Sequence, residues 1–140
     1  MTSEPDIRNQ IVEWVLVEGT KHPSIGSFVI QYCDYLNRLD LAVDRIFVGT
    51  LVVNPQAAGC AVSFSREQNK LNEFIVSHEQ FEQLRERKQD PMQFILSCGQ
   101  EISVDLEAGD CLGMADLEGL KEAGYTEFLG LPLMVGQDIL

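Results

Sequence analysis

The chain has 140 residues and a formal net charge of −12 at neutral pH. This length suits one domain around one hydrophobic core, and the sequence has no run of about 18 uncharged apolar residues to cross a bilayer. Residues 1–6 lack the basic and apolar regions of a secretion signal. We therefore expect a soluble protein of the cytoplasm with no membrane partner.

The acidic residues are concentrated in the second half of the chain. Residues 71–140 carry 14 acidic and 4 basic side chains, whereas residues 1–70 carry 8 and 6. Proteins that bind nucleic acid use clusters of Lys and Arg to displace the counterions of phosphates. The sequence has no such cluster, so we expect no nucleic-acid partner and interpret the acidic surface as one that favours solubility.

Two helices are predicted at the start of the chain. In residues 7–18 apolar side chains recur at helical spacing, with Asp6 as N-cap and Gly19 as the terminating residue. A second helix is predicted from residue 25 to about residue 39, with Ser24 as its N-cap. The two helices are expected to pack on a common core.

A β-hairpin is predicted next. Residues 43–53 are mostly β-branched or aromatic and stop at Asn54 and Pro55, and apolar and small side chains alternate in residues 60–65. A short third strand is predicted at 72–76. A hairpin alone is only marginally stable, so helices and later strands must cover one face of it.

The later elements complete an α+β fold. They are predicted in this order: a solvated helix at 79–88, an apolar segment at 92–96 that fits a helix turn or a strand, a strand at 101–106, a helix at 116–123 ended by Gly124, and a closing strand at 125–135. The expected architecture is an antiparallel sheet of about four to five strands with helices packed against it. Residues 136–140 stand where a turn would start another strand, so we expect a truncated fold.

The residues that most often carry catalysis are few and scattered. His22 and His78 are interpreted as surface or capping residues, and Asp105 and Glu107 as an exposed strand face rather than a metal site. The glycines form no phosphate-binding loop. We therefore expect no catalytic residue, no metal and no cofactor.

The cysteines give no sign of a metal or redox motif. They are separated by 27, 38 and 13 residues, so none forms a Cys-x-x-Cys pair. We interpret all four as buried free thiols: Cys33, Cys60, Cys98 and Cys111.

The first helix is apolar around nearly its whole circumference. Ile11, Trp14 and Val15 lie at its centre, and three further apolar residues flank them: Val12, Leu16 and Val17. Such a helix must be buried on more than one side, and a small sheet covers only one. Ile11, Trp14 and Val15 are therefore the candidate interface for a homodimer or an adjacent domain. A small-molecule ligand stays an open alternative, because an apolar pocket leaves no motif.

Three segments resemble the N-terminal regulatory region of bacterial class III adenylate/guanylate cyclases. They are residues 12–15 (Val-Glu-Trp-Val), residues 44–55 and residues 117–133. The third is the most distinctive, because residues 123–133 read Ala-Gly-Tyr-Thr-Glu-Phe-Leu-Gly-Leu-Pro-Leu, as in that family. The chain departs from the family at Asn54, where the family has His before the proline.

The resemblance implies one GAF-like regulatory domain over residues 1–140 that lacks its last strand and helix. It also implies a role in cyclic nucleotide signalling, with an adjacent cyclase domain as a partner. The paired metal-binding aspartates of a cyclase domain have no counterpart in this sequence. We therefore expect a non-catalytic sensor that responds to an unidentified ligand or partner.

Two other readings stay open. In the first interpretation, the chain is a small stand-alone interaction protein that dimerises through its apolar first helix. In the second, it is a small enzyme that uses His78 or a cysteine, although no partner group is visible for either.

Overall fold

The computed structural model describes residues 4–86, 90–109, 111, 113–135 and 138–139. It confirms an α+β chain, which separates into two compact units, Met1–Val76 and Ser77–Leu140. Each unit is described by itself below. In the described part of the chain, no helix is both long and apolar enough to cross a membrane. That residues 1–140 form one GAF-like domain stays a prediction.

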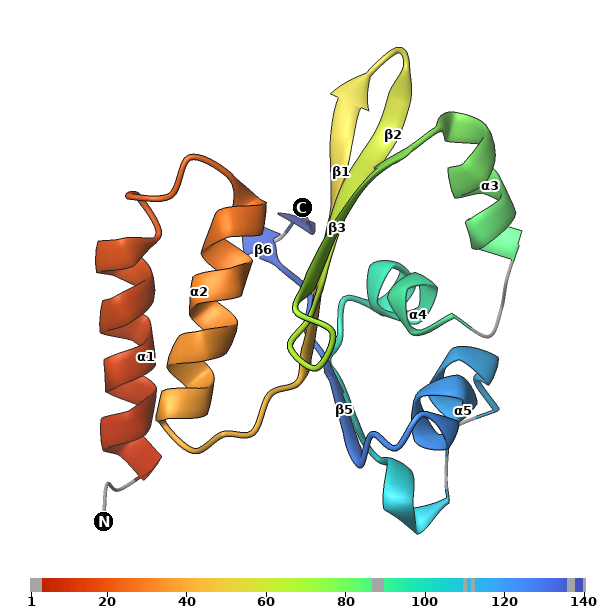
Figure 1. Ribbon diagram of the computed structural model, residues 1–140. Helices are drawn as coiled ribbons and strands as arrows, with labels where there is room; N and C mark the ends of the chain where they lie inside the picture. Colours follow the sequence, from red (N-terminus) through yellow and green to blue (C-terminus); the bar gives the residue numbers. More distant parts are fainter. Residues whose placement is uncertain (1–3, 87–89, 110, 112, 136–137, 140) are drawn as a thin grey trace. The chain divides into compact units, whose positions relative to one another are not determined.

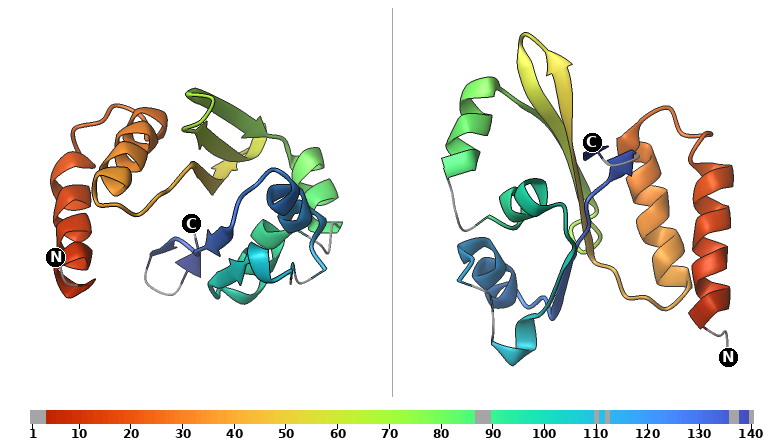
Figure 2. Two further views of the ribbon diagram at one scale, coloured as in Figure 1. Left: turned by 60° about the horizontal axis from the view of Figure 1, so that its bottom comes forward. Right: turned by 180° about the vertical axis from the view of Figure 1, so that it is seen from behind.

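The first unit stacks two helices on one side of a sheet. Its elements are α1 (Glu4–Glu18), α2 (Ile25–Arg38), β1 (Arg45–Asn54), β2 (Ala57–Ser65) and β3 (Lys70–Val76). The three strands are antiparallel in the order β1-β2-β3. Figures 1 and 2 show α1 on the side of α2 that faces away from the sheet.

The starts of the two helices differ in how well the sequence predicts them. Ser24 is the N-cap of α2, as expected, and its side chain accepts a hydrogen bond from the Ser27 N–H. The prediction of Asp6 as N-cap was wrong, because α1 already begins at Glu4. Asp6 instead lies in the first turn, where a negative charge is favourable beside the helix dipole.

The core of the first unit lies between α2 and the sheet. Val29 and Cys33 of α2 pack with Val62 and Phe64 of β2. Gly26 permits this close approach, because a Cβ there would lie 2.6 Å from the Glu73 carboxylate and 2.8 Å from Leu71 on β3. The helix is therefore in close contact with the third strand.

Asn37 connects the end of α2 to two loops. Its side-chain amide donates to the carbonyl oxygens of Cys33 and Val43, at 2.8 and 2.7 Å. Its side-chain oxygen accepts from the guanidinium of Arg66, which follows β2, at 2.9 Å. The backbone N–H of Arg66 donates to the Asp44 carbonyl at 2.8 Å. One side chain thus joins the helix end, the connection to β1 and the turn after β2.

The predicted hairpin is confirmed. Ile46 pairs with Phe64 and Val48 with Val62, so these four side chains share the face that packs on α2. The register shifts between Leu51 and Asn54, near the turn. The third strand is longer than the predicted 72–76, because it begins at Lys70.

The second unit is made of short elements around its own core. They are α3 (His78–Glu86), α4 (Pro91–Cys98), β4 (Ile102–Asp105), the 3-10 helix η1 (Leu106–Ala108), α5 (Ala115–Glu122), β5 (Glu127–Gly130), β6 (Met134–Val135) and β7 (Asp138–Ile139). β4 pairs with β5 and β6 with β7, both antiparallel. Of the predicted helix at 79–88, residues 87–88 lie outside the described residues.

The core of the second unit is centred on Leu106 and Leu117, both 0% exposed. Five other buried residues complete it: Ile95, Ile102, Val104, Cys111 and Met114. Residues 117–133 thus supply a central core residue, Leu117.

The prediction of a single sheet of four to five strands was wrong for the described residues. They form one three-stranded sheet and two two-stranded sheets. The expected closing strand at 125–135 is split, with β5 ending at Gly130 and β6 starting at Met134. Pro132 lies in the gap, and proline cannot donate a hydrogen bond to a neighbouring strand.

The ambiguous segment at 92–96 belongs to helix α4. Asp90 caps it by accepting a hydrogen bond from the Met92 N–H at 2.8 Å, and Pro91 occupies the first turn. Gly99 ends it in the left-handed conformation, with φ of 65°. These capping residues identify the segment as a helix, which the spacing of its apolar residues alone could not do.

After the closing strand, the chain does enter another strand. The two residues of β7 pair with β6, with Met134 opposite Ile139. Residues 136–137 and 140 of the expected final turn lie outside the described residues. The expectation of a missing last strand and helix stays a prediction.

Replacing Leu117 with Ala should destabilise the second unit by about 2–5 kcal/mol, because the substitution leaves a cavity at the centre of its core. Urea unfolding followed by circular dichroism measures the change. Leu129→Ala is the matched control, since Leu129 is 61% exposed. Equal effects of the two substitutions would contradict the proposed core.

Candidate functional site

An aromatic cluster joins α1 to α2. The Trp14 ring of α1 stacks on the Tyr35 ring of α2, with centroids 4.8 Å apart and planes 10° apart. Trp14 also contacts Phe28 and Tyr32, at centroid distances of 5.7 and 5.8 Å. Phe28, Tyr32 and Tyr35 recur at spacings of four and three, so they share one face of α2. Aromatic pairs of this kind stabilise a contact beyond the area they bury.

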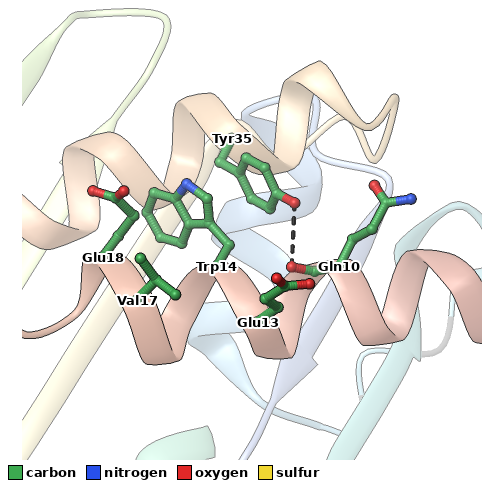
Figure 3. A pocket seen from close by; sticks show the side chains of 6 residues that line it. All are labelled: Gln10, Glu13, Trp14, Val17, Glu18 and Tyr35. Carbon is green, nitrogen blue, oxygen red and sulfur yellow. Dashed lines mark hydrogen bonds between the residues drawn. The ribbon is translucent and has the colours of Figure 1, made fainter.

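An open cavity of about 260 Å³ lies beside this cluster. Its lining residues come from both helices: Gln10, Glu13, Trp14, Val17 and Glu18 of α1, and Tyr35 of α2. Figure 3 shows the two aromatic rings side by side, with the Tyr35 hydroxyl directed to the backbone of Gln10. That hydroxyl donates to the Gln10 carbonyl oxygen at 3.2 Å. The hydrogen bond fixes the Tyr35 ring at the cavity wall.

The two carboxylates at the cavity differ in their surroundings. Glu18 accepts a hydrogen bond from the Lys21 ammonium, at 3.2 Å. Glu13 is exposed to solvent and is one of the residues that line the cavity. The cavity therefore combines aromatic rings with a negative charge at its edge.

The structure places the three predicted interface residues on the inner half of α1. Ile11, Trp14 and Val15 are all half-buried, and Trp14 packs on α2 within the same chain. The more exposed apolar side chains are the three that flank them: Val12 at 53%, Leu16 at 72% and Val17 at 50%. An all-round apolar helix has no polar face, so its periodicity does not reveal which side is inward. The interface itself stays a prediction.

The two histidines lie in unlike surroundings. His22 is half-buried, with its Nδ1 atom 3.3 Å from the Ser27 hydroxyl oxygen and its ring at 75° to the Phe28 ring. His22 therefore packs at the N-terminal end of α2. His78 is exposed and is the first residue of α3.

Asp105 has a capping role in the second unit. Its carboxylate caps η1 by accepting hydrogen bonds from the N–H groups of Glu107 and Ala108, at 3.0 and 3.4 Å. In the described part of the chain, no three His, Cys, Asp or Glu residues come together as a metal site.

All four cysteines are free thiols, but they are not all buried. Cys33 and Cys111 are buried, Cys60 is half-buried and Cys98 is exposed. The expectation of buried thiols is therefore confirmed for Cys33 and Cys111, holds only in part for Cys60 and was wrong at Cys98. It lies in the last turn of α4, where its thiol donates to the Phe94 carbonyl oxygen at 3.0 Å.

Two groups on α2 have shifted acidities. Burial raises the pKa of the Tyr32 hydroxyl, and burial is also the largest cause of the raised pKa of the Cys33 thiol. The charges of Asp44 and Asp34 raise the pKa of Cys33 further, whereas Arg66 opposes them. The neutral form of each group is therefore favoured in the folded chain.

Comparison with protein-family models, with curated proteins and with solved structures finds no match.

The stability of the first unit should fall as the pH rises through the alkaline range. Because folding raises the pKa values of Cys33 and Tyr32, the stability that their neutral forms contribute is complete below the unperturbed pKa values of 9.0 and 10.0 and is lost as the pH rises through the raised folded values. Urea midpoints followed by Trp14 fluorescence across this range measure the loss. The fall should be smaller in Tyr32→Phe, and an identical pH profile in the two proteins would refute the role of Tyr32.

Proposed function

We propose that the chain is a non-catalytic regulatory module of the cytoplasm, GAF-like in fold, that resembles the N-terminal region of class III nucleotide cyclases. The observation that carries this proposal is the resemblance of residues 117–133. In the structure this segment begins in helix α5, turns at Gly124 with φ of 98° and runs into β5. Its helix–glycine–strand order is the one that the sequence pattern predicts.

The contact of α1 with α2 supports a regulatory role for the first unit. The aromatic cluster holds α1 against α2, while three apolar side chains of α1 stay exposed. The cavity beside Trp14 adjoins this same contact. A ligand or partner that binds there would change the packing of α1, and that change is the proposed signal.

The size of the cavity limits the ligand. Small-molecule sites usually measure about 300–1,000 Å³. At about 260 Å³, this cavity suits a ligand of side-chain size rather than a nucleotide. We therefore propose a small effector or a partner side chain, with an adjacent cyclase domain as the recipient of the signal.

The regulatory role is tested by fusing the chain ahead of a class III cyclase catalytic domain. Trp14→Leu removes the stacking on Tyr35, so the fusion should make cyclic AMP at a rate several-fold different from that of the wild-type fusion. The control is Glu67→Gln, at an exposed position. The chain alone, given ATP with Mg²⁺ or Mn²⁺, should give no product.

The two parts of this proposal fail separately. Turnover by the chain alone would overturn the non-catalytic part. Equal rates from the wild-type, Trp14→Leu and Glu67→Gln fusions would overturn the regulatory part.

The exposed side of α1 favours a second candidate, a stand-alone interaction protein that dimerises through this helix. Val12 and Leu16 lie four residues apart, so they share one face of the helix, and both are exposed. Two such faces in contact would remove their apolar area from water, which is the main favourable term in association.

Light scattering after size exclusion tests the dimer with a pair of matched variants. Leu16→Glu should convert a dimer into a monomer, because it places a charge in the proposed contact. Ile75→Glu, at a side chain on β3 that is 78% exposed, should leave the dimer intact. A wild-type chain that is monomeric, or dissociation caused equally by both variants, would contradict this reading.

A further inference from the structure

The wall of the α1–α2 cavity has the composition of a site for cations. Trp14 and Tyr35 both line it, and their rings are nearly parallel with centroids 4.8 Å apart. Carbon atoms of stacked rings meet at about 3.5–4.0 Å, so the two rings are offset, and each leaves part of its face uncovered by the other. The face of an aromatic ring is the negative pole of its quadrupole.

A carboxylate adds to this negative potential. Lys21 already neutralises Glu18 at the other end of the cavity, at 3.2 Å. Glu13 lies one residue before Trp14 and contributes an exposed carboxylate to the lining (Figure 3). The combination of aromatic rings with one carboxylate attracts a positive group through both cation–π and ionic interactions.

The same lining disfavours an anionic ligand. The described lining residues include two carboxylates and no Lys or Arg, and the nearby Lys21 ammonium already pairs with Glu18, which disfavours an anion. Among the described lining residues, the remaining apolar side chain is Val17, so most of the apolar lining is aromatic. Residues 1–70 carry 8 acidic and 6 basic side chains, and this small negative excess adds a weak long-range attraction for cations at low salt.

We propose that this cavity binds an organic cation, an ammonium or guanidinium group. The group is carried either by a small molecule or by a basic side chain of a protein partner. The volume of about 260 Å³ accommodates a group of this size. The inference rests on the proposed function, because it names the ligand class of the same cavity, and its binding tests can fail independently of the fusion assay.

The only tryptophan of the chain is Trp14, so its fluorescence reports directly on the cavity. The chain is titrated at constant ionic strength with choline and, separately, with 3,3-dimethylbutan-1-ol, a neutral molecule of the same shape. Choline should change the emission and reach saturation, whereas the neutral molecule should have no effect. Equal responses to the two molecules, or no saturable response to choline or to the basic probes below, overturn the proposal.

Two further titrations distinguish the sources of the cation. The probes are arginine with both ends blocked and a lysine- and arginine-rich peptide. A peptide that binds more tightly than the blocked arginine identifies a partner side chain as the source. Choline binding that equals or exceeds peptide binding identifies a small molecule. Both results support the cation site.

Variants test which groups hold the cation. Glu13→Gln should weaken cation binding about three- to fivefold, as expected for one exposed ionic contact. The matched control Glu67→Gln removes the same charge at an exposed residue that does not line the cavity and should leave binding unchanged. Equal weakening by both variants would show that only the net charge matters and would overturn the site.

The aromatic wall is tested at Tyr35. Tyr35→Phe keeps the ring and should retain binding, whereas Tyr35→Leu removes the ring and should abolish the saturable response. Circular dichroism checks that both variants are folded. Full binding by a folded Tyr35→Leu variant would contradict the cation–π contact.

Discussion

The first unit depends on helix α2, because this helix buries two different faces. Val29 and Cys33 on one face pack on the sheet, and Phe28, Tyr32 and Tyr35 on the next face pack on Trp14. Phe28 and Tyr32 directly precede Val29 and Cys33 in the sequence, so the two faces lie next to each other around the helix. A helix with two buried faces removes apolar surface from water on both of them. This burial is the main favourable contribution to its stability. The position of α1, and with it the cavity, follows from the second face.

Much of the local structure could be predicted from the sequence, because its signals are local. Ser24 caps α2 through its own hydroxyl, and the β-branched run of β1 ends where the sequence changes to Asn and Pro. The arrangement of the sheets could not be predicted in this way. Strand pairing depends on contacts between distant segments, and the alternation in the closing segment continues past Pro132, where the strand is broken.

The residues of the α1–α2 cavity could be predicted only in part from the sequence. The apolar character of α1 drew attention to Trp14 as an interface residue, and the structure places this residue at the centre of an aromatic contact within the chain. Tyr35 and Glu13 gave no comparable signal, because a tyrosine in a helix and an exposed glutamate are both common. The spacing of Phe28, Tyr32 and Tyr35 was the available clue, but period alone does not say which side chain of another helix the rings meet.

Asn37 gives the first unit a property that its core alone would not supply. Because it bonds to Cys33 and Val43, and also holds Arg66, the last turn of α2, the connection to β1 and the turn after β2 share one set of hydrogen bonds. None of these segments can detach without breaking bonds made by the others. Amide protons in the three segments are therefore expected to exchange with solvent through one shared opening rather than by independent fraying.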